Sequence, residues 1–170
     1  AHCSAASLPD PASLLAEISA AEKRLNYLVE LANHDLAVWG DPGWSQLAAH
    51  GVRTPGSALH ETELPLIYSA STINIDVGRL YQSDIITMRI FDILACGGFV
   101  LAEHSEALAE AFELGVEIES YRTLPELQDK VAHYLRHPDQ ARTLAAAGRE
   151  AVLTRHTIQG RVREMLAART

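Results

Sequence analysis

Short apolar segments alternate along this chain with longer segments in which apolar residues recur at helical spacing. The short segments are typical of buried β-strands and the longer ones of amphipathic helices. Strands and helices in this order imply right-handed crossover connections, which give parallel strands with helices on both faces. We therefore predict an α/β fold with a Rossmann-like parallel sheet of about five strands.

The limits of these elements follow from caps and breaks in the sequence. Asp10-Pro11 favours a helix start, Gly97-Gly98 a helix end, and Pro138 a break between two helices. The expected strands cover residues 36–39, 52–54, 71–77, 99–102 and 116–119. The expected helices cover residues 11–33, 43–50, 64–70, 84–96, 105–114, 123–136 and 139–168, the last with an interruption near 155–157. We divide the chain into an N-terminal helix and linker, 1–35, and a Rossmann-like domain, 36–170.

Charge and composition exclude several classes of protein. The net charge of −8 argues against general nucleic-acid binding, which needs a basic face. Cys3 and Cys96 do not form a disulfide framework. The sequence contains neither a run of 18 apolar residues nor a basic start followed by an apolar core, so we expect no membrane span and a cytoplasmic location.

Common nucleotide and metal motifs do not fit this sequence. Gly40-Asp-Pro-Gly43 places an acid where a dinucleotide fold brings in a pyrophosphate, and there is no P-loop Gly-Lys-Ser/Thr. A response-regulator receiver domain needs a lysine at the end of its fifth strand, and the fifth expected strand here is not followed by one. His133 and His137 have metal-ligand spacing but no third ligand nearby in sequence, and Cys96 is typical of a small residue at a helix end. We expect neither a metal nor a cofactor.

The segment 84–98 departs from simple packing. Asp84, Arg89 and Asp92 interrupt an otherwise apolar helix that starts after the third expected strand. Ligands bind parallel sheets at the carboxyl ends of the strands, and helix N-termini there favour anions. Two interpretations remain open: an anion site, or a surface ion pair of Arg89 with Asp92 together with Asp84 as a helix cap.

Several spaced motifs in this region resemble one known family. They are Leu64-Pro-Leu-Ile-Tyr-Ser-Ala-Ser-Thr-Ile-Asn-Ile-Asp76, Thr87-Met-Arg-Ile-Phe-Asp-Ile-Leu-Ala-Cys-Gly-Gly-Phe-Val100, Tyr121-Arg-Thr-Leu-Pro-Glu-Leu127 and Tyr134-Leu-Arg-His-Pro138. From about Leu64 to Leu166 the chain resembles the carboxy-terminal donor-binding domain of GT-B-type glycosyltransferases, in particular the CgeB-like spore-maturation enzymes. The resemblance implies that the expected sheet is one half of a GT-B fold.

The resemblance also implies roles for individual residues. Asp92 takes the place of the family's glutamate that holds the ribose hydroxyls, and Asp84 that of the upstream acid that contacts the donor sugar. Arg89 resembles the basic residue that neutralises the diphosphate, helped by the amides of 86–88. The expected donor-binding residues are Asp84, Thr87, Met88, Arg89, Asp92 and Gly97.

The function expected from this resemblance is binding of a nucleotide-diphosphate sugar for a glycosyltransferase. The acceptor site would belong to an amino-terminal domain, so we assign no catalytic residue. An alternative is a non-catalytic Rossmann-like nucleotide-binding or interaction module, because both acids are aspartate and the usual loop Arg and Lys are missing. The apolar stripe of the helix 11–33 either covers the sheet or docks on a partner chain, which would allow a homodimer.

Overall fold

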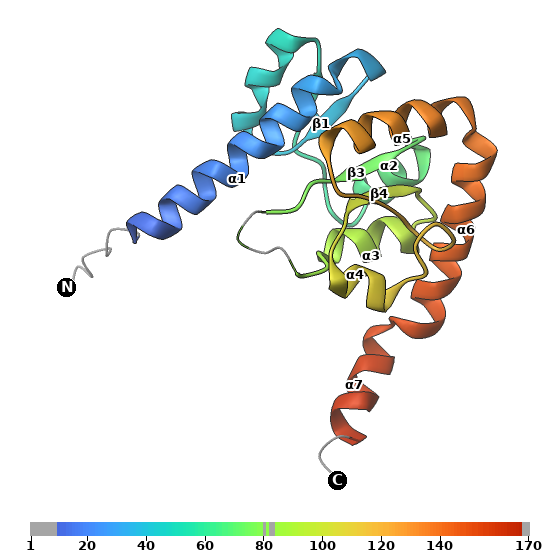
Figure 1. The fold of residues 1–170 in the computed structure, drawn as a ribbon. Coiled ribbons are helices and arrows are strands. Elements are labelled where there is room, and N and C mark those ends of the chain that lie inside the picture. The colour runs from blue at the N-terminus through green and yellow to red at the C-terminus, as the bar shows by residue number, and fades with distance from the viewer. Residues whose placement is uncertain (1–9, 80, 82–83, 168–170) are drawn as a thin grey trace.

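The computed structural model describes residues 10–79, 81 and 84–167 (Figure 1). The elements are, in chain order, α1 (Pro11–Glu30), a 3-10 helix (Ala32–His34), β1 (Ala37–Trp39), a second 3-10 helix (Pro42–His50), β2 (Arg53–Gly56), α2 (Leu64–Ala70), β3 (Asn74–Asp76), α3 (Met88–Ala95), β4 (Val100–Glu103), α4 (Glu106–Ala111), β5 (Glu119–Tyr121), α5 (Leu124–Arg136), α6 (Pro138–Arg155) and α7 (Ile158–Ala167). The order of strands and helices agrees with the prediction, and the α/β class with parallel strands is confirmed.

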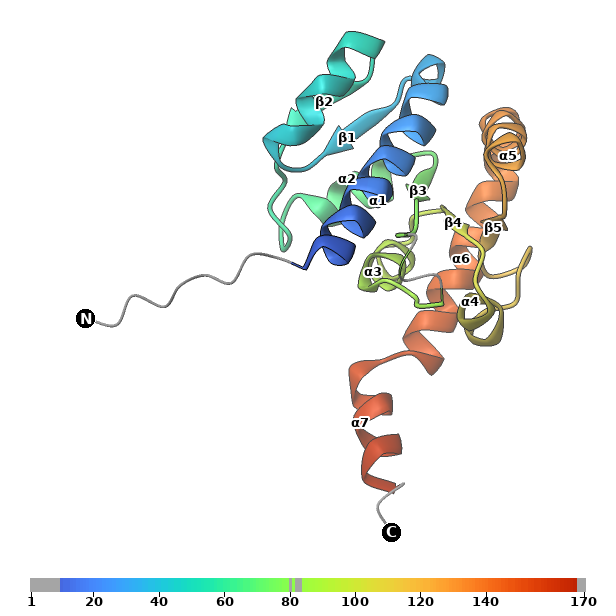
Figure 2. The same ribbon diagram turned by 60° about the vertical axis from the view of Figure 1, so that its left-hand side comes forward.

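The five strands lie in two sheets rather than one. β1 pairs with β2, and β3, β4 and β5 pair in that order, with every pairing parallel. In Figure 2 the β1–β2 pair lies on the side of α1, and the three-stranded sheet lies on the side of α5 and α6. The single sheet expected from the sequence is therefore wrong in this detail, because no described strand joins β1 to β3.

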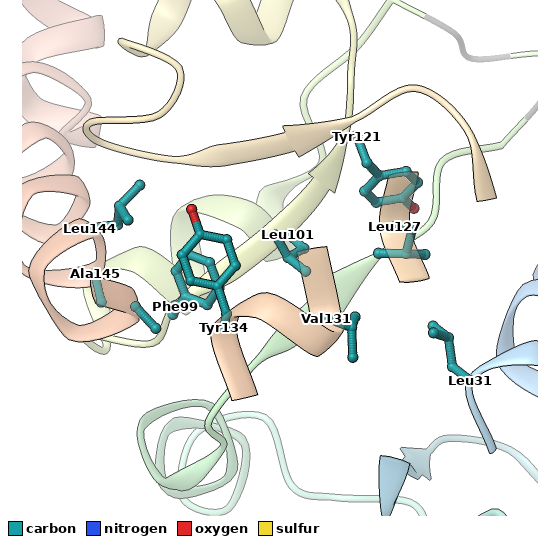
Figure 3. Close-up of a cluster of buried hydrophobic side chains, with 10 residues drawn as sticks. Leu31, Phe99, Leu101, Tyr121, Leu127, Val131, Tyr134, Leu144 and Ala145 are labelled. Carbon is teal, nitrogen blue, oxygen red and sulfur yellow. The ribbon is translucent and has the colours of Figure 1, made fainter. Parts of the chain in front are cut away.

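Helices cover both faces of the three-stranded sheet, as predicted. The side chain of Leu101 on β4 points into a cluster formed with α5 and the start of α6, shown in Figure 3. Its neighbours Val100 and Ala102 point into a second cluster formed with α3, α4 and the end of α6. Alternate residues of a strand face opposite sides, so β4 is buried on both faces.

The start of α3 differs from the prediction. We expected a helix from residue 84, but α3 begins at Met88, and residues 84–87 belong to the loop after β3. The helix ends as predicted, because Gly97 adopts φ +76° and its N–H donates to the carbonyl of Leu94. This shortening leaves the first turn of α3 directly at the carboxyl end of β3.

The ends of the described chain differ in their packing. Leu31, which follows α1, is buried in the Leu101 cluster, whereas α7 projects away from the sheets in Figures 1 and 2. The proposed boundary between residues 35 and 36 stays a prediction, and Cys3 lies outside the described residues. Within the described part of the chain, no helix is both long and apolar enough to cross a membrane.

Candidate donor-binding site

A cleft of about 530 Å³ opens at the carboxyl ends of β3 and β4. The loop after β3, the first turn of α3, the residues after β4 and the middle of α1 form its walls. The lining residues are Lys23, Arg24, Asp76, Val77, Gly78, Arg79, Ile85, Ile86, Thr87, Met88, Arg89, Ile90, Glu103, His104, Ser105 and Leu108. This is the edge at which open parallel sheets bind ligands.

Asp76, the last residue of β3, provides a buried carboxylate at the bottom of this cleft. Its side chain is 5% exposed and accepts a hydrogen bond of 2.9 Å from Nη1 of Arg89 and one of 3.4 Å from the hydroxyl of Thr87. Burial raises the pKa of Asp76, and the nearby guanidinium of Arg89 partly opposes this rise. Arg89 itself is half exposed, so its remaining N–H groups stay accessible from the cleft.

The end of β4 is tied to α1 by an ion pair. Nζ of Lys23 donates to both oxygens of Glu103, at 2.6 and 2.7 Å, and the N–H of Gly78 donates to Oε2 of the same carboxylate at 2.9 Å. The neighbouring His104 side chain is 8% exposed, and its Nε2 has no hydrogen-bond partner among the described residues; it lies 3.5 Å from Oε1 of Glu106. A buried ring nitrogen without a partner is available to a ligand.

The charges that line the cleft favour an anion. Lys23, Arg24, Arg79 and Arg89 outnumber the two acids, Asp76 and Glu103, although the whole chain carries a net charge of −8. No side chain caps the first turn of α3, so its amide N–H groups add positive partial charge to the same wall. The cleft therefore suits a ligand with one or two phosphates.

The structure brings three of the six expected residues into this cleft. Thr87, Met88 and Arg89 line it, at the start of α3. Asp92 lies one turn further along α3, where Oδ2 is 3.5 Å from Nε2 of His60. Gly97 lies at the far end of the helix and does not line the cleft.

Both alternative roles for the charged residues of this helix are wrong. Arg89 pairs with Asp76 and not with Asp92. Asp84 does not cap α3, because Oδ1 accepts a hydrogen bond of 2.9 Å from the N–H of Ala107 in the first turn of α4. Asp84 thus joins the loop after β3 to α4, next in sequence to the cleft residue Ile85.

Sequence reasoning did not find the residues that α1 contributes. Lys23 and Arg24 fall in the segment 1–35, to which we assigned no part in the site. Asp76 lies inside the expected strand 71–77 and ends one of the quoted motifs, and Glu103 directly follows the expected strand 99–102, but neither was named as a site residue. Lys23 is one of two lysines in the chain, and Asp76 is an acid that ends a β-branched strand; both are signals that could have been used.

The structure gives no support to the metal-ligand spacing of His133 and His137. Their rings lie 4.6 Å apart, but Nε2 of His133 contacts Oε1 of Gln140 at 2.8 Å. Among the described residues, no three or more His, Cys, Asp or Glu side chains are grouped so that they could hold a metal ion. The expectation that the site works without a metal stays a prediction.

A protein-family profile identifies the chain. The profile of a family described as glycosyl transferase-like matches residues 17–167. The chain belongs to this glycosyl transferase-like family. The match includes α1 from residue 17 onward, so it extends further toward the N-terminus than the motifs quoted above. No match was found among curated proteins.

Solved structures show the same fold. A glycosyltransferase from Rickettsia africae ESF-5 superposes with a TM-score of 0.65 and 16% identity over 85% of this chain and 42% of its own. Anabaena HepE, solved in complex with UDP-glucose, gives a TM-score of 0.66 and 17% identity over 84% of this chain and 44% of its own. The C-terminal domain of LpcC from Francisella tularensis gives a TM-score of 0.62 and 13% identity over 84% of this chain and 82% of its own.

These coverages relate the chain to part of a larger architecture. The chain spans less than half the length of the Rickettsia and Anabaena glycosyltransferases, but most of the isolated C-terminal domain from Francisella. The fold therefore matches the Rossmann-like half of a GT-B architecture, as the sequence predicted.

Proposed function

We propose that this chain is the donor-binding domain of a glycosyltransferase that uses a nucleoside diphosphate sugar. The observation that carries the proposal is the cationic cleft at the carboxyl ends of β3 and β4, in a chain of the glycosyl transferase-like family. The related fold of HepE was solved with UDP-glucose and with UDP, which supports a donor of this class. Membership of the CgeB-like subfamily and a cytoplasmic location are part of the proposal.

In this proposal the diphosphate lies against the first turn of α3. The free N–H groups of Arg89 and the amides of Thr87 and Met88 would hold its oxygens, and Arg24 and Arg79 also line this cleft. Asp92 would accept the ribose hydroxyls, because its side chain is 36% exposed and its Oδ2 lies 3.5 Å from Nε2 of the exposed His60. Asp84 would contact the sugar through the oxygen that does not bind Ala107.

These positive groups would also assist transfer. When the bond between the sugar and the diphosphate breaks, both bonding electrons go to the departing phosphate oxygen, and the acceptor hydroxyl supplies the new bond to the sugar. Cationic groups that already face this oxygen stabilise the charge as it develops. The acceptor and the group that takes its proton would lie in an amino-terminal domain, so no residue of this chain is assigned as catalytic.

Isothermal titration calorimetry with UDP-glucose tests the donor site. The variant R89A should lower the affinity about 10- to 100-fold, because one charge-assisted contact contributes about 1.5–3 kcal/mol. D92A should also weaken binding, whereas R163A, which removes an equal charge from α7, should not. Circular dichroism shows whether each variant keeps its fold.

The result can contradict the proposal at two levels. Failure of UDP-, GDP- and dTDP-sugars to bind the unmodified chain would overturn the donor function. Binding that R89A and D92A leave unchanged would overturn the site while keeping the function.

One observation favours the alternative of a non-catalytic module. Arg89 and Lys23 already have acidic partners, so part of the positive charge in the cleft is neutralised within the chain. A longer polypeptide with an amino-terminal domain decides between the two. Sugar transfer by that polypeptide, lost in R89A, supports the enzyme, whereas donor binding without transfer to any acceptor supports the module.

A further inference from the structure

Three of the four basic side chains that line the cationic cleft are paired with acids. The pairs are Lys23 with Glu103, Arg89 with Asp76, and Arg79 with Glu17. Arg24 differs, because no acidic side chain in the described ranges forms an ion pair with it; its Nε donates to the carbonyl of Ala20, one turn earlier in α1, at 3.1 Å. The positive charge that remains for a ligand is therefore concentrated on Arg24.

The guanidinium of Arg24 lies over the indole ring of Trp44. Its Cζ is 6.0 Å from the centroid of the ring. A guanidinium in this position is attracted by the electrons of the ring, while its N–H groups stay free for hydrogen bonds to an anion. Trp44 belongs to the second 3-10 helix, which packs against α1, and lies outside the cationic cleft.

The ring of Trp44 in turn packs on a glycine that follows β1. A Cβ at Gly40 would lie 2.6 Å from Cδ1 and 2.8 Å from Nε1 of the ring, so any larger residue here would displace the ring. The N–H of Gly40 donates to the carbonyl of Gly56 at 2.9 Å, which ties this point to β2. The position of the ring is thus set by the β1–β2 sheet.

Arg24 and Arg89 act at the same place in the cleft. Both line the cationic cleft and also the neighbouring cleft of about 440 Å³, which Trp44 lines as well. Burial raises the pKa of Asp76, and the positive charges of Arg89 and Arg24 both oppose this rise. The two guanidinium groups therefore lie near one carboxylate, with Arg89 paired to it and Arg24 not.

We propose that Trp44 is a positioning residue of the donor site, which holds the guanidinium of Arg24 where it binds the diphosphate. The inference rests on the proposed donor function for the identity of the ligand. Arg24 supplies the charge that the described acids leave without a partner, and Trp44 sets the direction of its N–H groups. The β1–β2 sheet, which contributes no residue to the lining of the cationic cleft, thereby takes part in donor binding.

Holding Arg24 before the ligand arrives favours binding. A long basic side chain that is free in solvent loses rotational freedom when it binds an anion, and this loss opposes binding. The contact with Trp44 and the hydrogen bond to Ala20 restrict Arg24 in the free protein. Less freedom is then lost when the diphosphate binds.

Isothermal titration calorimetry with UDP-glucose and with inorganic pyrophosphate tests the inference. R24A should lower the affinity for both probes about 10- to 100-fold, because a charge-assisted contact is lost. W44L should lower both about 3- to 10-fold, whereas W44F keeps an aromatic face and should retain most of the affinity. R53A removes an equal charge from β2 and should change neither affinity. Circular dichroism shows whether each variant keeps its fold.

A double-mutant cycle separates positioning from a structural role of Trp44. If Trp44 acts through Arg24, W44L should have no further effect on affinity in a chain that already carries R24A. G40A provides a second, smaller change, because its new Cβ displaces the ring and leaves both side chains present. It should lower the affinity about 2- to 5-fold in the parent chain and not in R24A.

The outcomes distinguish this inference from the donor function. UDP-glucose binding that R24A leaves unchanged would overturn the inference and leave the donor function standing. An effect of W44L that is equally large in R24A would also overturn it, since Trp44 would then act independently of Arg24. Pyrophosphate binding that needs both residues, with no binding of UDP-, GDP- or dTDP-sugars, would overturn the donor function and support the inference.

Discussion

Asp76 shows how one buried residue shapes the cleft. Its carboxylate is removed from water, bound by Arg89 and Thr87, and its own carbonyl accepts a hydrogen bond of 2.9 Å from the buried hydroxyl of Tyr121. Burial also raises the pKa of Tyr121 strongly, so this hydroxyl stays protonated and remains a donor. The network orients Arg89 but also neutralises part of its charge.

The variant D76N should change both the pH dependence of stability and the affinity for anions. Burial raises the pKa of Asp76 in the folded protein above its ordinary value of 3.8, so the folded state holds this proton more tightly than the unfolded state. Its contribution to stability is therefore lost as the pH rises from about 4 through the raised pKa. D76N should remove this loss, measured by urea unfolding at a series of pH values.

The same substitution should strengthen donor binding about 3- to 10-fold, because it removes a negative charge beside the diphosphate position. Calorimetry with UDP-glucose measures the effect. D129N, an exposed position on α5, is the matched control and should change neither property. A weaker affinity in D76N would mean that Asp76 holds Arg89 in its binding geometry.

At the scale of elements, α6 is packed against α3 through a glycine. A Cβ at Gly148 would lie 2.3 Å from the carbonyl oxygen of Glu117 and 2.7 Å from Cδ2 of Leu94. Backbone at that distance cannot move aside easily, so the close approach of α6 requires glycine. Because α3 carries Arg89, this contact also supports the position of the site.

G148A should destabilise the protein by about 1–3 kcal/mol, as overpacking does. The gain of about 1 kcal/mol from replacing glycine with alanine in a helix does not offset the clash. G160A on α7 is the control, because its Cβ would meet only the flexible hydroxyl of Thr157, at 3.2 Å. That variant should leave stability unchanged or raise it slightly. Urea unfolding of both variants measures the difference, and equal stabilities would contradict this account of the α3–α6 contact.

Capping residues in the sequence predicted the starts of α4 and α5 correctly, because a cap acts within one helical turn. Ser105 caps α4 through the N–H of Leu108, and Thr123 caps α5 through the N–H of Glu126, as their sequence positions indicate. The start of α3 was misplaced by four residues, 84 instead of 88. Its position depends on Asp84 binding Ala107 on α4, a contact 23 residues away that helical spacing does not contain.

For the whole molecule, the positive cleft coexists with a strongly negative chain. The acids are distributed over the surface, while four basic side chains from α1, α3 and the loop after β3 meet at one edge. A bound donor would link these elements, because each contributes to the walls. Ligand binding should therefore stabilise the fold as a whole.

UDP-glucose at 100 times its dissociation constant should stabilise the chain by about 2.7 kcal/mol. For a domain of this size, that raises the Tm by about 5–11 °C. R89A at the same concentration should show a much smaller rise, and R163A the full rise. Differential scanning calorimetry measures the three shifts, and an equal shift in R89A would remove Arg89 from the site.

The sequence by itself determined the class of fold, the order of its elements and the end of α3 at Gly97. These depend on periodicity, caps and spaced motifs, which are properties of neighbouring residues. Tertiary structure decided that Arg89 binds Asp76, that Lys23 and Arg24 of α1 join the cleft, and that the strands form two sheets. The physical reason is distance along the chain: each of these features joins residues from different elements, and their pairing depends on how strands and helices pack.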